Sequence, residues 1–207
     1  MKPIHSGLFF VFSIIYLALI PFDSTAISWL IKILPIMVLV VVVAKAPGFS
    51  GRILLLLALA FSACGDVLLQ QGYFVPGVAA FLMAQLHYGV FFVRNWSSVT
   101  TRWPISVLMM VYMLVMAFLL TPHLGELIVP VFAYLVVIGF MGLLATQSNM
   151  PLKWAVLGAF VFILSDSFIA IDRFLRPLPF SGYLIMITYY GAQWMIIQGA
   201  LKKFRSV

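Results

Sequence analysis

The sequence predicts an all-α, polytopic membrane protein in which eight transmembrane helices cross the bilayer. Two observations carry this prediction. The chain has 207 residues, of which 65% are hydrophobic and only 8% are charged, whereas a soluble globular domain is about 45–50% apolar and about 25% charged. The apolar runs are also long and continuous, without the residue-by-residue alternation of an outer-membrane β-barrel. Helices are therefore the expected spanning elements.

Composition excludes several other classes of protein. The high aliphatic and aromatic content excludes a disordered chain, and the single cysteine, Cys64, excludes a disulfide-stabilised scaffold. The basic residues form no stripe, so no nucleic-acid partner is expected. Eight helices of about 20 residues each would use roughly 160 residues. Residues 1–207 are therefore expected to form a single transmembrane domain with no soluble domain.

Proline, glycine and charged residues divide the chain into the eight predicted helices. Most prolines lie near the divisions, where they suit turns and first helical turns. Pro35 falls well inside a segment and is expected to kink the second helix. The first segment is expected to be an uncleaved helix, because no clear signal-peptide cleavage site follows it. The predicted helices span residues 7–22, 27–45, 52–71, 74–94, 103–121, 126–146, 152–173 and 181–201.

Basic residues predict the orientation of the bundle, because those in short loops collect on the cytoplasmic side. With the N-terminus in the cytoplasm, the opposite side keeps only Arg173 and Arg176 as basic loop residues. Both termini are therefore expected to be cytoplasmic, in a multi-pass protein of the cell (inner) membrane. The net charge of +7 suits contact with anionic lipid headgroups. The basic residues on the expected cytoplasmic side are Lys2, Lys45, Arg52, Arg94, Arg102, Lys153, Lys202, Lys203 and Arg205.

Ionisable side chains at membrane depth are the strongest indication of a functional site, because each costs about 2.5–3.5 kcal/mol to insert. Asp66 lies 14 residues after Arg52, and Asp166 lies 13 residues after Lys153. The two predicted helices run in the same direction, so both carboxylates are expected about 20 Å from the cytoplasmic face. Four such side chains occur: Lys32, Asp66, His87 and Asp166.

Two aspartates at one depth can share a cavity in which loss of water and mutual repulsion divide them into an acid and a base. The alternative is that each caps a neighbouring helix or pairs with Lys32. Lys32 itself can extend toward the outer surface, or it can meet a phosphate or a carboxylate. His87 is expected to be a hydrogen-bonded packing residue or a lipid-interface residue rather than a ligand. No cluster has the spacing of a metal site, so no metal or cofactor is expected.

Polar residues at the end of the seventh predicted helix suggest a binding role. Asp166, Ala170 and Arg173 share one helical face by their spacing. Arg173 can therefore hold an anionic headgroup over Asp166, or it can pair with Asp172 as an interfacial anchor. On the eighth helix, Gln193 is too deep for the interfacial aromatic belt.

A weak internal repeat is visible as well. Gly65-Asp66 and Ala84-Gln85 on the third and fourth predicted helices match Ser165-Asp166 and Ala192-Gln193 on the seventh and eighth. The pattern predicts a parallel four-plus-four duplication.

These stretches resemble the YhhN family of membrane proteins, whose characterised members are lysoplasmalogenases. The resemblance lies in residues 61–69, 165–174 and 189–193 and in Lys32 ahead of Pro35, and it extends over essentially the whole chain. The chain departs from the family at Gln85, where many relatives have a histidine.

The resemblance implies hydrolysis of the vinyl-ether bond of a lysoplasmalogen, a lysophospholipid, to a fatty aldehyde and a glycerophospho-base. Asp66 and Asp166 are then the expected catalytic pair. A proton-coupled or small-solute transporter that uses the same aspartates remains the main alternative, and a lipid-binding structural protein is a third. The expected substrate-binding residues are Lys32, Tyr88, Ser165, Asp172, Arg173, Tyr190 and Gln193.

Overall fold

A computed structural model describes residues 1, 3–22, 27–97 and 101–205 of the chain. This part of the chain contains eight α-helices and no strand, and each helix lies where the sequence predicts one, within a few residues. The turns η4 (Leu152–Val156) and η5 (Ile171–Leu175) are π-helical and flank the seventh helix. The helices are α1 (Pro3–Leu19), α2 (Ser28–Ala44), α3 (Arg52–Gln70), α4 (Phe74–Val93), α5 (Trp103–Leu120), α6 (Ile128–Thr146), α7 (Leu157–Ala170) and α8 (Ser181–Arg205).

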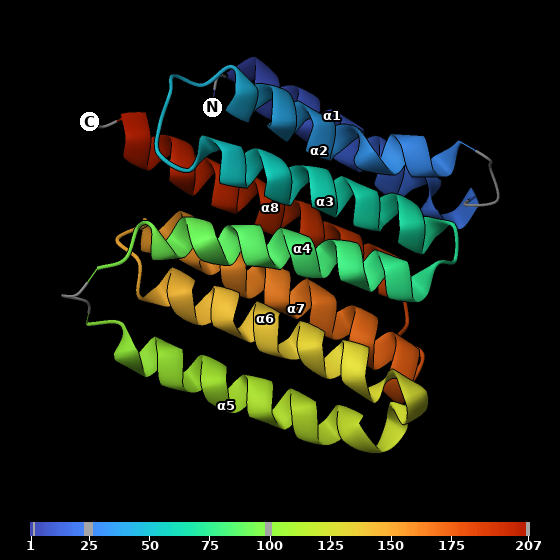
Figure 1. Ribbon diagram of the computed structural model, residues 1–207. Coiled ribbons are helices and arrows are strands. Elements are labelled where there is room, and N and C mark those ends of the chain that lie inside the picture. The colour runs from blue at the N-terminus through green and yellow to red at the C-terminus, as the bar shows by residue number, and fades with distance from the viewer. Residues whose placement is uncertain (2, 23–26, 98–100, 206–207) are drawn as a thin grey trace.

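The helices form a bundle in which successive helices run in opposite directions (Figure 1). Both termini therefore lie at one end, where the amino group of Met1 donates a hydrogen bond to Gln198 Oε1 on α8 at 3.1 Å. The basic ends of α2 and α4, at Lys45 and Arg94, lie at this same end. Lys2 lies outside the described residues. The orientation in the membrane remains a prediction.

Several helices are long and apolar enough to cross a membrane, which confirms the all-α membrane class. The apolar helix α2 is shorter, at 17 residues. Helix α8 is more polar, but most of its described side chains are buried or half-buried among the other helices, and polar side chains in membrane helices face the interior of the bundle. The count of eight crossings therefore stays a prediction. The six long apolar segments are Pro3–Phe22, Arg52–Gln70, Phe74–Val93, Trp103–His123, Gly125–Thr146 and Leu152–Leu175.

Glycines let α8 approach its neighbours closely. A Cβ atom at Gly158 of α7 would lie 2.9 Å from the backbone nitrogen of Ile196, and one at Gly199 would lie 2.6 Å from that of Ala155. Close backbone contact through small residues is a common mode of helix association in membranes. These contacts hold α8 close against α7 and η4.

The predicted tight connection between α3 and α4 is confirmed at Gly72. This residue has a φ of +83°, a conformation that glycine adopts without a steric penalty. A Cβ atom at Gly65 would lie 2.6 Å from the ring of Phe81, so the two helices pack closely beyond the turn. This packing holds Asp66, the next residue, toward α8 rather than toward α4. The four-plus-four repeat stays a prediction.

Candidate active site

A cavity of about 460 Å³ is lined by the C-terminal parts of α1, α3 and α7 and by the N-terminal parts of α2, α4 and α8. It therefore lies in the half of the bundle opposite the termini, between helices from both halves of the sequence. Asp66 and Asp166 both line it, although they are 100 positions apart in the chain. Six of the predicted site residues line this cavity: Lys32, Asp66, Ser165, Asp166, Asp172 and Arg173.

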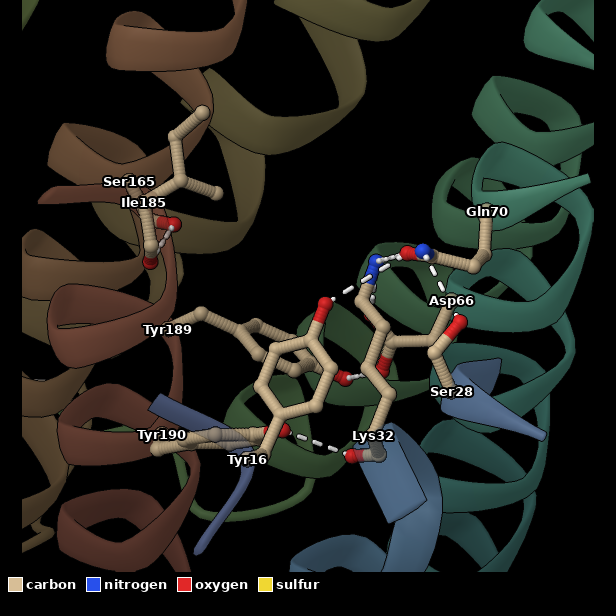
Figure 2. Close-up of polar contacts among 9 residues, drawn as sticks. All are labelled: Tyr16, Ser28, Lys32, Asp66, Gln70, Ser165, Ile185, Tyr189 and Tyr190. Carbon is tan, nitrogen blue, oxygen red and sulfur yellow. Dashed lines mark hydrogen bonds and ion pairs between the residues drawn. The ribbon is translucent and has the colours of Figure 1, made fainter. Parts of the chain in front are cut away.

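Asp66 is held by a cation and a hydroxyl group. Its Oδ1 lies 3.6 Å from Lys32 Nζ, and its Oδ2 accepts a hydrogen bond from the Tyr189 hydroxyl at 2.6 Å (Figure 2). Only 2% of Asp66 and 7% of Lys32 is exposed. Of the roles that the sequence leaves open for Lys32, pairing with a carboxylate is therefore the one found.

A second group of contacts fixes the position of Lys32. Its Nζ donates to Gln70 Oε1 at 3.3 Å, and its backbone oxygen accepts a hydrogen bond from the Tyr190 hydroxyl at 2.7 Å (Figure 2). The same Gln70 oxygen accepts from Tyr16 at 3.4 Å, and Gln70 Nε2 donates to Ser28 at 3.5 Å. Helices α1, α2, α3 and α8 thus meet around one ammonium group.

Asp166 has a different environment. Its Oδ2 accepts a short hydrogen bond from the hydroxyl of Tyr134 on α6. Gln85 Nε2 in turn lies 3.5 Å from the Tyr134 oxygen, and within the described residues the buried Gln85 Oε1 has no partner. No ammonium or guanidinium group of the described residues pairs with Asp166. One aspartate is thus ion-paired and the other is not.

Asp172 and Arg173 lie at the mouth of the cavity, on the π-helical turn η5. Asp172 Oδ1 accepts a hydrogen bond from the backbone N–H of Leu178 at 2.7 Å. The Arg173 guanidinium lies over the ring of Phe74, 4.5 Å from its centre. The Asp172–Arg173 ion pair, the alternative that the sequence left open, is not present between these described side chains.

The shared face predicted for Asp166, Ala170 and Arg173 is only partly kept in the structure. Asp166 lines the polar cavity with Arg173 and also the narrow apolar cleft beside it with Ala170, but neither space is lined by both Ala170 and Arg173. The α-helical periodicity ends at Ala170, because the wider π-helical turn follows and displaces the later side chains.

The chain belongs to the YhhN family. Its family model matches residues 27–200, which include Lys32, Asp66 and Asp166. Bovine lysoplasmalogenase TMEM86A is 35% identical over 94% of this chain and 87% of its own length. Mouse lysoplasmalogenase TMEM86B is 36% identical over 92% of this chain and 83% of its own length. A lysoplasmalogenase of Mycobacterium bovis is 31% identical over 69% of this chain. No solved structure matches the chain.

Three residues expected to line the cavity of this YhhN-family chain do not line it: Tyr88, Tyr190 and Gln193. The Tyr88 hydroxyl donates a short hydrogen bond to Gln193 Oε1, and Gln193 Nε2 donates to Ser62 Oγ at 3.0 Å. Ser62 lies one turn before Asp66, so these groups form a layer behind the aspartate. Ser165 lines the cavity, but its hydroxyl donates to the backbone oxygen of Ile185 at 3.0 Å (Figure 2).

Two other predictions concern histidine and metal ligands. His87 stacks on Phe61 with ring centres 5.3 Å apart, and its Nδ1 lies 2.6 Å from the Met83 carbonyl oxygen. These contacts are those of a hydrogen-bonded packing residue, one of the two roles expected for His87. Within the part of the chain that the structure describes, no group of three or more His, Cys, Asp or Glu side chains could hold a metal ion.

Sequence reasoning missed the tyrosines that contact the aspartates. Tyr189 lies within the stretch 189–193 that resembles the YhhN family, but the sequence favoured its neighbour Tyr190 as a site residue. Adjacent helical residues differ by about 100° in direction, so only one of them can face the cavity. Tyr134 lies within a strongly apolar helix, and nothing in its local sequence distinguishes it from a packing residue.

Proposed function

We propose that this protein is a membrane-embedded hydrolase that cleaves the vinyl-ether bond of a lysoplasmalogen. The observation that carries the proposal is the pair of aspartates on one cavity, one ion-paired and the other without a cationic partner among the described residues. The similarity to lysoplasmalogenases of mammals and mycobacteria over most of the chain supports an ether-bond hydrolase.

Vinyl-ether hydrolysis needs a proton donor and a group that activates water. A proton adds to the chain carbon that is β to the ether oxygen, and the positive charge spreads over the adjacent carbon and that oxygen. Water adds to the charged carbon and gives up one proton, which restores the catalyst. The resulting hemiacetal breaks its bond to the glycerol oxygen, its hydroxyl proton passes to that oxygen, and a fatty aldehyde is released. Glycosidases handle a similar cation with two carboxyl groups.

The two aspartates suit different roles in this reaction. Asp66 is paired with Lys32 and bonded by Tyr189, which favours a carboxylate that stabilises the cation and takes a proton from the attacking water. That proton then passes across the shared cavity to Asp166, which regenerates the acid. Asp166 has no such cation, and a buried carboxylate without one is costly. This supports Asp166 as the general acid, with Tyr134 orienting its carboxyl group.

The remaining predicted site residues divide into three groups in this proposal. Arg173 and Asp172 at the mouth contact the headgroup, with the guanidinium suited to bidentate binding of the phosphate. Lys32 and Ser165 line the same cavity from α2 and α7. Tyr88, Tyr190 and Gln193 act indirectly, through hydrogen bonds that hold Lys32 and the helical turn before Asp66 in position.

The membrane topology completes the proposal. Eight crossings with cytoplasmic termini would put both aspartates in the outer half of the bilayer of the cell membrane. A lysophospholipid could then enter sideways from the bilayer with its headgroup at the interface. The vinyl-ether bond lies just below the headgroup, which is the depth expected for the aspartates.

The test is aldehyde release by purified protein from a lysoplasmalogen in D₂O. Protonation of carbon predicts one deuterium on the aldehyde carbon next to the carbonyl group. The matched substrate control is the lysolipid with a saturated alkyl ether, which has no double bond to protonate and should not react. Release of the headgroup instead of an aldehyde, or equal reaction of the saturated ether, would contradict the proposal.

The same preparation separates the hydrolase from the transporter alternative. A hydrolase turns over in detergent micelles, where no gradient exists. A transporter moves protons or solute only across a sealed vesicle and releases no aldehyde in micelles.

A further inference from the structure

A narrow apolar cleft adjoins the polar cavity and shares a wall with it. This cleft has a volume of about 50 Å³, and the two spaces share Leu69, Phe74, Phe81, Asp166 and Ile169. Beyond the shared wall, the cleft is lined by Val78, Val131, Tyr134, Ala170 and Phe174, which we call the chain cleft residues. Asp166 lies on the boundary between a polar space and an apolar one.

We infer that the cleft binds the first carbons of the substrate's hydrocarbon chain while the polar cavity holds its glycerophosphate part. This inference rests on the proposed function. A lysoplasmalogen has one chain, and its vinyl ether is the junction between the apolar and the polar part. The junction of the two spaces therefore matches the junction in the lipid. The carbon that receives the proton belongs to the chain, next to Asp166, and the water comes from the polar side.

Aromatic residues between the cavity and the cleft place the phosphate-binding cation and the cleft in the same order as the headgroup and the chain of the lipid. Phe74 lines both spaces, and the Arg173 guanidinium lies over its ring at 4.5 Å. Phe174, on the cleft side, meets Phe74 with ring centres 5.9 Å apart. The cation that can bind a phosphate is thus one ring away from the cleft, as a short glycerol linker requires.

The dimensions of the cleft predict what the enzyme selects. At about 50 Å³, against about 460 Å³ for the polar cavity, the cleft admits one chain and leaves little room for a branch near the double bond. Val78 on α4 and Val131 on α6 lie on its apolar side. These side chains act as specificity determinants for a straight chain.

Kinetics on two substrates test the inference. One is a straight-chain lysoplasmalogen, and the other carries a methyl branch on the third carbon of the alkenyl chain. Val78→Phe narrows the cleft and should lower kcat/KM for the straight chain by about tenfold or more. Val78→Ala widens it and should raise the ratio of branched to straight turnover by about tenfold. Misfolding lowers both rates alike, so it cannot raise this ratio.

The matched control is Val90→Phe. Val90 lies on the same helix, is 44% exposed and lines none of these spaces, so both rates should remain at the wild-type level. A selectivity ratio that stays unchanged in both Val78 variants would overturn the inference.

Photolabelling gives a readout that does not depend on turnover. The probe is a lysolipid with a saturated ether and a diazirine near the start of its chain. We expect label on chain cleft residues, and Val78→Phe should remove it. Label confined to the two apolar grooves along α5, which include Leu108 and Phe132, would overturn the inference. If wild-type protein releases no aldehyde, the proposed function fails, and the labelling still decides whether the cleft binds the chain.

Discussion

The Lys32 ammonium nitrogen lies 3.6 Å from an Asp66 carboxylate oxygen, and both side chains are buried. A buried ion pair contributes little net stability, but removal of one partner leaves an uncompensated charge. Lys32 therefore has a structural role besides its role in the proposed reaction, because it compensates the buried charge of Asp66.

Lys32→Met should lower the free energy of unfolding by about 3–5 kcal/mol, because it leaves the Asp66 carboxylate buried without a cation. The double variant Lys32→Met with Asp66→Asn should recover most of this loss and remain inactive. Thermal unfolding in detergent measures both. The control is Lys45→Met, at the exposed end of the same helix, which should change stability little. Equal stability of Lys32→Met and wild type would contradict the prediction.

Asp66→Asn and Asp166→Asn should each lower kcat by about a hundredfold or more, the usual contribution of an acid–base group. Because the two carboxyl groups act in one reaction, the double variant should be little worse than either single variant. Steady-state aldehyde release measures all three. Glu126→Gln removes an exposed carboxylate and should leave kcat unchanged. Appreciable activity in a folded single variant removes that aspartate from the catalytic pair.

Tyr134→Phe should lower kcat by about tenfold, because it removes a hydrogen bond to the Asp166 carboxyl group. KM should not change, since phenylalanine keeps the ring that lines the chain cleft and loses only the hydroxyl that bonds Asp166. Tyr112→Phe is the control: the Tyr112 hydroxyl bonds Ser167, the neighbour of Asp166, at 2.7 Å. An equal loss of kcat in both variants would show general disturbance of α7 instead of a positioning role for Tyr134.

The fold could be predicted in detail, because hydrophobic runs and their Pro and Gly boundaries are local properties of the sequence. The turn at Gly72 is an example. The partners of the aspartates could not be predicted. Lys32 and Asp66 are 34 positions apart on different helices, and their contact depends on how α2 and α3 are rotated against each other. The sequence favoured Tyr190 over Tyr189 for the same reason. Which of the two faces the cavity depends on the rotation of α8, and packing, here through glycine contacts along α8, sets that rotation.

The topology prediction follows from the distribution of basic residues. After Val207, we expect activity from a reporter that functions in the cytoplasm and none from one that functions outside. Near Glu126, we expect the reverse. Paired alkaline phosphatase and fluorescent protein fusions measure this. Charge reversal of Lys45 and Arg52 should weaken the orientation, since the positive-inside effect operates through short loops. External activity of the Val207 fusion would contradict both the orientation and the depth assigned to the aspartates.

Arg173→Lys separates headgroup binding from a structural role. The guanidinium lies at the mouth of the cavity over Phe74, where it can bind a phosphate through two parallel hydrogen bonds, which lysine cannot do. If the phosphate is held equally in the ground and transition states, KM should rise by about tenfold while kcat stays nearly constant. Thermal stability should change little, because Asp172 bonds the Leu178 backbone rather than Arg173. Arg176→Lys, on the exposed segment that follows, is the control and should leave KM unaltered. A lower melting temperature with an unchanged KM would instead assign Arg173 a structural role.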